Sequence, residues 1–486
     1  MLSDEFPPSC SQIATCPDCG INWTFKIRSQ DVQAAAATTT LRMSTTVREP
    51  YMDEIFHVPQ AQRFCAGTFQ EWDPMITTLP GLYLYSAALL RSLGLLLGLP
   101  GKEACTVTLL RLTNITFTLG NLTLLYQLVG WLHAGKGISR HHRLLSAATL
   151  SLFPVLYFFN FFYYTDPGAV FFSLGTYLSS VKGRHGTAAV FGVVSILFRQ
   201  TNVIWVAFCG MLIVSGHVEQ AWGEDEDKKE QVKKGRLRQM SKGWDVAKFF
   251  SRFLSSPHRL NGLLSQVWPY ATVGILFLIF IILNGGIVVG DRQSHVACLH
   301  LPQFIYFLVF TLVFSIPMYL SPARVWRCAS TARSHPLLTL ILIMASFCSL
   351  LFFSYTHPYL LADNRHYTFY AWRRLLGRRG PAILVLVPGS LAAGVVLNDQ
   401  LHEHSPLWRI SFLVCVLIAT VPQRLLEFRY FIMPYLLFRV HAQPPPISRL
   451  LVECLLYLTI NLLTFHLFLN RPFHWIGHPG HQRFMW

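Results

Sequence analysis

The sequence has few charged residues for its length. Asp, Glu, Lys and Arg make up only 13% of the 486 residues, whereas they make up about a quarter of a typical soluble domain. Hydrophobic residues reach 52%. This composition excludes an ordinary soluble domain and predicts an all-α polytopic membrane protein, because a helix satisfies its own backbone hydrogen bonds inside lipid.

The N-terminal segment lacks any long hydrophobic run. Residues 1–47 are polar and rich in Ala, Thr and Ser. They therefore contain neither the apolar core of a secretory signal peptide nor a transmembrane helix. We predict that this segment is a disordered tail, since it offers little apolar surface to bury.

The cysteines lack the paired spacing of a zinc site. The CPDC motif, Cys16 to Cys19, has no second CxxC partner, and a zinc ribbon needs two such pairs. Most of the 11 cysteines stand alone, many of them inside hydrophobic segments, where we expect small apolar packing groups. We therefore expect no metal and no cofactor.

The sequence also lacks an internal repeat of fixed period, which disfavours a transporter built from inverted repeats. The net charge of +16 is dispersed over short loops, a pattern that indicates contact with membrane lipid and no binding of nucleic acid. One mixed-charge stretch, residues 217–260, is predicted to be a solvated loop. The positive loops do not fit one simple alternation of spans, so the orientation of each span stays open.

Hydrophobic segments, by contrast, are abundant. A spanning helix needs roughly 17 to 25 apolar residues, and by that measure residues 79–486 form a body with about eleven transmembrane helices. The predicted spans are residues 79–99, 106–132, 144–164, 167–181, 187–216, 266–290, 302–320, 336–355, 380–397, 407–439 and 450–469.

Ionisable residues inside or beside these spans are few. The motifs YYTDPG, FRQTN and LLEFRYF supply Asp166, Arg199, Glu427 and Arg429. A charged residue costs roughly 2.5 to 3.5 kcal/mol to insert, so each of these either contacts substrate or pairs with another charge. The sequence leaves both alternatives open. Arginine suits a phosphate ligand, because its planar fork meets two oxygens at once.

A polar stretch, residues 48–78, precedes the first predicted span and holds the adjacent acids Asp53 and Glu54. A carboxylate at a membrane surface can act as the base for an attacking hydroxyl, while nearby positive groups take the charge of a leaving phosphate. The same residues also fit an ordinary amphipathic helix at the interface. Residue chemistry alone does not decide between the two.

Long motifs along the chain resemble one known family. These motifs are PYMDEIFHVPQAQRF, WDPMITTLPGLYLYS, YFFNFFYYTDPG, FRQTNVIW, NGGIVVGDRQSHVACLHLPQ, HPYLLADNRHYTFYAWRR, VPQRLLEFRYFIMPY and QRFMW. In this order, from about Arg48 to Trp486, they closely resemble the dolichyl-phosphate-glucose α-1,2-glucosyltransferases.

The resemblance implies a GT-C glycosyltransferase fold with lumenal catalytic loops, in the endoplasmic reticulum membrane. The implied reaction moves the third and last glucose from dolichyl-phosphate-glucose onto the lipid-linked Glc2Man9GlcNAc2 oligosaccharide by an inverting displacement. The implied partners are this donor, the lipid-linked acceptor and membrane lipid. The alternative is a non-enzymatic transporter or channel-associated subunit on the same scaffold.

The resemblance also assigns residues. Asp53 corresponds to the catalytic base in the first lumenal loop, residues 48–78, with Glu54 beside it. Chemistry on matching motifs then suggests Arg365 and His366 for the donor phosphate, with Arg292 and His295 as second choices. It suggests Trp72, Asp73, Asp363, Tyr367 and Tyr370 for the substrates, although the aromatic residues also fit the interfacial aromatic belt. One departure is the tail: the family begins with a transmembrane helix before Arg48, and residues 1–47 lack it.

Overall fold

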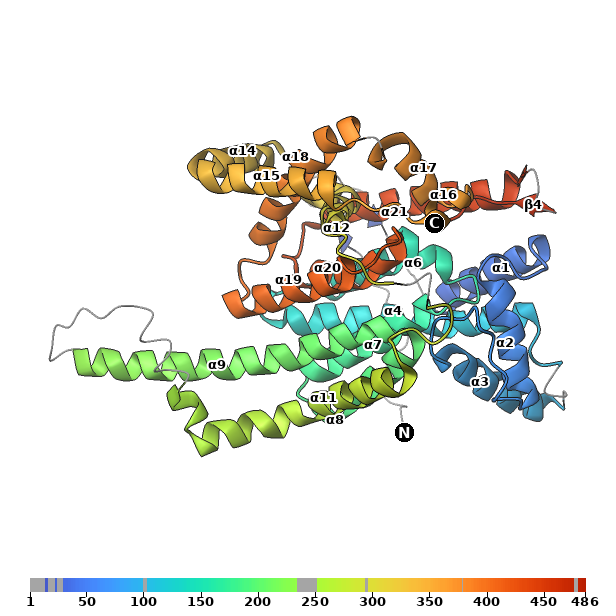
Figure 1. Ribbon diagram of the computed structural model, residues 1–486, viewed down its shortest axis with the longest axis horizontal. Coiled ribbons are helices and arrows are strands. Elements are labelled where there is room, and N and C mark those ends of the chain that lie inside the picture. The colour runs from blue at the N-terminus through green and yellow to red at the C-terminus, as the bar shows by residue number, and fades with distance from the viewer. Residues whose placement is uncertain are drawn as a thin grey trace.

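The computed structural model describes residues 14–15, 22–23, 29–98, 103–233, 251–292, 296–377, 379–475 and 480–486. The CPDC motif and His295 lie outside these residues. Within them, the chain is built almost wholly of helices (Figure 1). The strands are two antiparallel pairs of two-residue strands, β1 with β2 and β3 with β4. The expectation of an all-α protein is therefore confirmed.

The described elements follow one another along the chain in this order. The first half contains β1 (Ala14–Thr15), β2 (Asn22–Trp23), α1 (Ser29–Thr46), α2 (Glu54–Ala66), α3 (Gly81–Leu97), α4 (Val107–Leu132), η1 (Ala134–Lys136), α5 (Arg140–Ser151), α6 (Pro154–Phe159), α7 (Asp166–Val181), α8 (His185–Phe198), η2 (Gln200–Asn202) and α9 (Val203–Lys233). The second half contains α11 (Pro257–Asn284), α12 (Pro302–Phe314), α13 (Ile316–Tyr319), α14 (Pro322–Ser334), α15 (Pro336–Phe352), α16 (Pro358–Ala362), α17 (Tyr367–Ala371), η3 (Trp372–Leu376), α18 (Arg379–Gln400), α19 (Pro406–Thr420), η4 (Phe428–Phe431), α20 (Ile432–His441), α21 (Ile447–Asn470), β3 (Phe473–His474) and β4 (His481–Gln482).

Fewer helices meet the length and composition of a membrane span than the sequence suggests, among the described residues. Among the described residues, 5 helices are long and apolar enough to cross a membrane, or up to 6 if the bent pair α14 and α15, which meet at 102°, is one span. The expected eleven spans are not confirmed, because several apolar segments form short helices such as α12 and α19 that are below the spanning length.

The surface of the long helices is apolar where a membrane would contact it. Leu278, Ile282 and Leu283 on α11 are exposed, as are Leu337 and Leu340 on α15. Exposed apolar surface of this extent marks contact with lipid or another protein. These outward residues agree with the multi-pass membrane character that the composition predicts.

Two expectations about polar segments need correction. The tail predicted to be disordered over residues 1–47 forms a helix at Ser29–Thr46, where an Ala-rich run favours helix and the buried Met43 lies on the side that packs against α4. The charged segment 217–260 is also helical in part, because α9 continues to Lys233 and α11 begins at Pro257. Helix α1 is not among the helices apolar enough to span a membrane.

The polar stretch 48–78 is part helix and part loop, and it has a core of its own. Helices α2 and α3 pack on each other around Phe64, Leu82 and Tyr83. Gly81 at the start of α3 lies so close to α8 that a Cβ there would stand 2.7 Å from the Leu197 carbonyl oxygen. This packing fixes the start of α2 against the multispan body, and Asp53 lies there.

Candidate active site

Glu54 anchors the polar stretch to the body through a buried ion pair. The side chains of Glu54 and Arg111, on α4, are both 0% exposed. Arg111 Nε donates to Glu54 Oε1 at 2.9 Å and Nη2 donates to Oε2 at 2.5 Å. The same oxygens accept backbone hydrogen bonds: the Tyr163 N–H donates to Oε1 at 2.7 Å, and the Tyr51 N–H donates to Oε2 at 3.1 Å. Glu54 therefore has a full set of protein partners.

Asp53, the residue directly before α2, has a partly exposed carboxylate, unlike the buried Glu54. Its side chain is 42% exposed, and Arg429 Nη1 donates to Oδ2 at 3.2 Å. Its backbone N–H donates to the Tyr164 hydroxyl at 3.2 Å, which fixes the residue without using the carboxylate. Desolvation acts to raise the pKa of Asp53, but the charges of Arg429, His57 and His366 outweigh it and hold the pKa below its usual value. Asp53 is therefore an accessible, ionised carboxylate.

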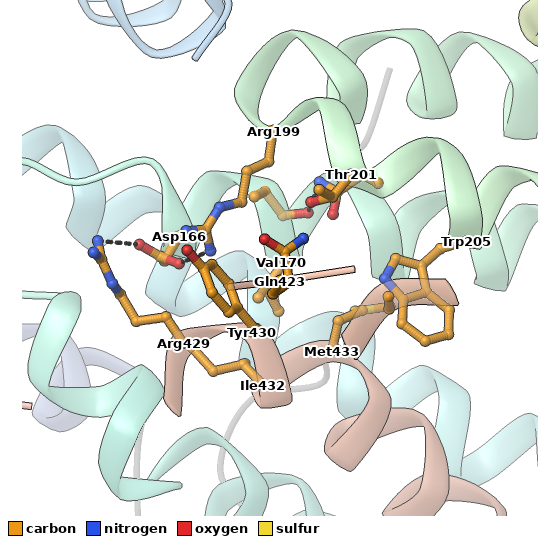
Figure 2. A pocket seen from close by; sticks show the side chains of 13 residues that line it. Asp166, Val170, Arg199, Thr201, Trp205, Gln423, Arg429, Tyr430, Ile432 and Met433 are labelled. Atoms are coloured by element: carbon orange, nitrogen blue, oxygen red, sulfur yellow. Dashed lines mark hydrogen bonds and ion pairs between the residues drawn. The ribbon is translucent and has the colours of Figure 1, made fainter. Parts of the chain in front are cut away.

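Arg429 lies at the centre of a group of carboxylates. Its Nη2 is 2.8 Å from Glu427 Oε2, and its Nη1 is 3.6 Å from Asp166 Oδ2 in addition to the contact with Asp53. Asp166 also forms an ion pair with Arg199, so that it lies between two arginines (Figure 2). The ionisable residues of the membrane body thus pair with one another and connect in a chain to Asp53.

A small cavity lies beside this chain of charges. Its lining includes Asp166, Arg199, Arg429, Tyr430 and Trp205, and Figure 2 shows their side chains around it. Its volume is about 40 Å³. A space of this size is large enough to admit water beside the paired charges.

His57 is a member of the site that sequence reasoning gave no role. Its Nδ1 lies within hydrogen-bond distance of the Tyr83 hydroxyl, and its ring meets Tyr164 edge-on. Burial lowers the pKa of His57, and the charge of Asp53 acts in the opposite direction. The spacing of four residues from Asp53 was a usable signal, because it places both side chains on one face of a helix.

Arg365 and His366, the residues predicted to bind the donor phosphate, lie beside the same site. Their side chains already have protein partners. Arg365 Nε and Nη2 donate to the two oxygens of Asp363 at 2.8 and 2.6 Å, and Nη1 donates to Gln482 Oε1 at 3.0 Å. His366 Nδ1 is 2.7 Å from the Trp486 oxygen. The structure therefore brings Asp363, Arg365 and His366 together.

The other predicted site residues lie in separate surroundings. Arg292 donates to Asn284 Oδ1 at 3.0 Å within its own loop. Tyr367 packs edge-on against Trp486 with ring centroids 5.1 Å apart, whereas Tyr370 contacts Phe484. Among the described contacts, none joins Arg292 to Asp53.

Trp72 and Asp73 shape the loop between α2 and α3. The Trp72 ring packs against Phe64 and Tyr83 in edge-on arrangements. Asp73 Oδ1 accepts a hydrogen bond from the Met75 N–H at 2.9 Å, which is the local turn that Asp favours. Both residues therefore have a structural explanation.

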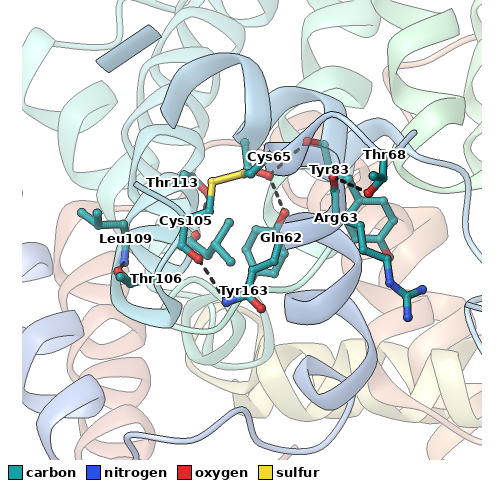
Figure 3. The surroundings of a disulfide bond; sticks show 12 residues. Gln62, Arg63, Cys65, Thr68, Tyr83, Cys105, Thr106, Leu109, Thr113 and Tyr163 are labelled. Atoms are coloured by element: carbon teal, nitrogen blue, oxygen red, sulfur yellow. Dashed lines mark hydrogen bonds between the residues drawn. A yellow bond between two sulfur atoms is a disulfide. The ribbon is translucent and has the colours of Figure 1, made fainter. Parts of the chain in front are cut away.

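A disulfide links the end of α2 to the start of α4, and the sequence did not indicate it. Cys65 at the end of α2 pairs with Cys105, just before the Thr106 cap of α4, across 40 residues (Figure 3). The expectation of single packing cysteines is wrong for this pair, because connectivity cannot be deduced from spacing alone. Disulfides persist mainly in oxidising compartments.

The helical membrane body and the open carboxylate held among paired charges are those of a polytopic membrane enzyme. The chain belongs to the DIE2/ALG10 family, whose family model matches residues 47–440. It is 45% identical over 450 residues to the rat protein named Dol-P-Glc:Glc(2)Man(9)GlcNAc(2)-PP-Dol alpha-1,2-glucosyltransferase, with 91% of this chain and 94% of the relative covered.

Relatives under the same name extend across kingdoms. A human protein is 44% identical, with 91% of this chain and 94% of the relative covered. An Arabidopsis thaliana protein is 34% identical, with 90% of this chain and 95% of the relative covered. No solved structure matches the chain. The resemblance stated from the motifs is therefore confirmed at the level of the family.

Proposed function

We propose that this chain transfers the third and last glucose from dolichyl-phosphate-glucose, in α-1,2 linkage, onto the lipid-linked Glc2Man9GlcNAc2 oligosaccharide used for protein N-glycosylation. The name shared by its relatives supports this function. The structural observation that carries it is the exposed Asp53 carboxylate held 3.2 Å from Arg429. A base beside a fixed cation is what displacement of a phosphate-linked sugar requires.

The reaction is a single inverting displacement. Asp53 removes the proton from the 2-hydroxyl of the acceptor's terminal glucose as that oxygen attacks the anomeric carbon of the donor. The bond from this carbon to the phosphate oxygen breaks, and dolichyl phosphate leaves with the electron pair. The sugar passes through an oxocarbenium-like transition state, as in inverting glycosidases.

Positive groups around Asp53 take the charge of the leaving phosphate. Arg429, whose Nη1 lies 3.2 Å from Asp53 Oδ2, and His366 are candidates for this role. Arg365 serves through its fixed pair with Asp363, which keeps its remaining N–H groups oriented. Arg292 stays a second choice.

The aromatic and acidic residues predicted to bind the substrates differ in the role that their surroundings favour. Tyr370 is half-buried near the motif of Arg365, which favours a sugar contact, whereas Trp72 and Asp73 serve by shaping the loop. Glu54 serves as a positioning residue, because its oxygens are used by Arg111 and two backbone N–H groups.

We infer that the protein is a GT-C glycosyltransferase of the endoplasmic reticulum membrane, with the region around Asp53 on the lumenal side. The Cys65–Cys105 disulfide supports this orientation, because the lumen is oxidising and the cytosol is not.

The test is complementation of cells that lack the last glucosyltransferase. We expect the full chain to convert the two-glucose lipid-linked glycan into the three-glucose species, and the Asp53→Asn chain, expressed at the same level, to leave it unconverted. Persistence of the two-glucose species with well-inserted full-length protein would refute the proposed function. The transporter alternative instead expects substitutions of Arg199 and Glu427 to dominate, with Asp53→Asn harmless.

A further inference from the structure

We propose that residues His481–Trp486, which we call the C-terminal strap, are a positioning element that aims the Asp53 carboxylate at Arg429. The inference rests on the function proposed above. In Figure 1 the C-terminus lies near α16.

The strap holds the side chain of Tyr51, two residues before Asp53. The Tyr51 hydroxyl donates to the Arg483 carbonyl oxygen at 2.9 Å and accepts from the Arg483 N–H at 2.8 Å. The Tyr51 ring also meets Phe468 of α21 edge-on, with centroids 5.7 Å apart. The Tyr51 hydroxyl thus both donates to and accepts from one residue of the strap, which fixes Tyr51 in place.

The strap also holds the segment that carries His366. The Met485 N–H donates to the Arg365 carbonyl at 2.9 Å, and the Tyr367 N–H donates to the Met485 carbonyl at 2.9 Å. These two bonds make a parallel bridge between His366 and Met485, and the Met485 side chain is 0% exposed. The same strap therefore fixes a histidine whose charge acts on Asp53.

The strap is itself fixed to the body at two points. Arg483 Nη1 donates to the Phe468 carbonyl at 2.6 Å, one of the carbonyls that the end of a helix leaves without intrahelical partners. The Trp486 ring packs against Phe314 and Phe428, with centroids 6.2 and 6.1 Å away. Phe428 directly precedes Arg429, so the strap reaches both partners of the Asp53–Arg429 pair.

The residue between Tyr51 and Asp53 shows why such fixing is needed. Met52 has φ of 56°, the left-handed region, and it is the one residue other than glycine with positive φ in the described part of the chain. A side chain with a Cβ adopts this conformation only when its surroundings impose it. Tyr51 is fixed by the strap and Glu54 by Arg111, so the strap supplies one of the two constraints that keep Met52 left-handed.

The test is the substitution Tyr51→Phe in the full chain, reconstituted in lipid, with kcat and donor KM measured per folded molecule. The phenylalanine keeps the ring and removes both bonds to the strap. We expect kcat to fall at least ~10-fold with donor KM within ~2-fold, since a misplacement of about 1 Å costs up to 10²-fold. We also expect the acid limb of the pH profile to move to higher pH, because Asp53 loses its fixed contact with Arg429.

Two further variants make the result decisive. Met52→Gly in the Tyr51→Phe background should restore part of kcat, because glycine adopts the left-handed region without cost. Tyr126→Phe on α4, whose ring packs under Arg143, is the matched control and should retain wild-type kcat.

Two outcomes would overturn the positioning role. One is a wild-type kcat and pH profile in Tyr51→Phe. The other is a loss confined to protein yield or melting temperature. Either result leaves the proposed function intact when the unmodified chain transfers glucose, whereas absence of transfer by the unmodified chain would refute that function instead.

Discussion

The two adjacent acids should respond to neutralisation in opposite ways. Asp53→Asn removes the base and leaves the fold, whereas Glu54→Gln removes a buried charge and leaves Arg111 without its counter-ion. Asn and Gln preserve the shape of each side chain, so charge is the only large change. The pair therefore separates a chemical role from a structural role at neighbouring positions.

The magnitudes follow from exposure and pairing. The Asp53 side chain is 42% exposed, and Arg429 keeps Glu427 and Asp166 as partners, so the stability change should stay below about 1 kcal/mol. The loss of a general base should lower kcat by about 10²- to 10⁴-fold. Glu54→Gln leaves a guanidinium that is 0% exposed without its carboxylate, which costs about 3 to 5 kcal/mol.

The assay is glucose transfer to a two-glucose lipid-linked acceptor by purified protein in lipid nanodiscs, read by glycan size, alongside thermal unfolding. The expected pattern is a stable, inactive Asp53→Asn protein and a Glu54→Gln protein that melts well below wild type. An Asp53→Asn protein with more than about a tenth of wild-type kcat would refute Asp53 as the base. A Glu54→Gln protein with wild-type stability but no activity would refute the positioning role of Glu54.

Three other substitutions test the surroundings of the site. Arg429→Gln should move the acid limb of the kcat/KM profile to higher pH, because Arg429 lowers the pKa of Asp53 and desolvation alone raises it. Cys65→Ser should lower the free energy of unfolding by about 4 kcal/mol by the chain-entropy relation for the loop closed with Cys105. Gly290→Ala should destabilise by about 1 to 3 kcal/mol, since its Cβ would stand 2.2 Å from a backbone oxygen of the loop before α3.

Each of these substitutions has a matched control. Arg429→Lys keeps the positive charge and should retain most of the low pKa of Asp53. Cys348→Ser changes a half-buried free cysteine and should leave the melting temperature within about 2 °C. Gly286→Ala, where a Cβ meets no atom within 4 Å, should be close to neutral. Equal effects in a variant and its control would contradict the explanation given for that variant.

Much of the architecture was predictable, because it depends on composition and on long apolar runs. The helical membrane body follows from few charges and many hydrophobic residues. The count of eleven spans is not confirmed, because apolar runs such as 407–439 break into α19, η4 and α20 around Glu427 and Arg429. An apolar window does not record where charged residues force the chain to turn.

The motifs supplied candidate site residues, but they did not show which side chains pair. The motif identified Asp53, yet the sequence did not separate it from Glu54, since that distinction comes from Arg111 on a distant helix. For Asp166 and Arg199, the sequence left open whether each contacts substrate or pairs with another charge. In this structure they form an ion pair with each other. Ion pairs between residues far apart in the sequence produce no local sequence pattern from which they could be predicted.

The contact between Tyr51 and Arg483 also sets an order of events during synthesis. The two residues are 432 positions apart, and a ribosome adds about 5 to 20 residues per second. The loop that carries Asp53 is therefore made about 20 to 90 s before the segment that holds it. The proposed role of the strap therefore implies that glucose transfer begins only once residues 481–486 have been made and have folded back onto Tyr51.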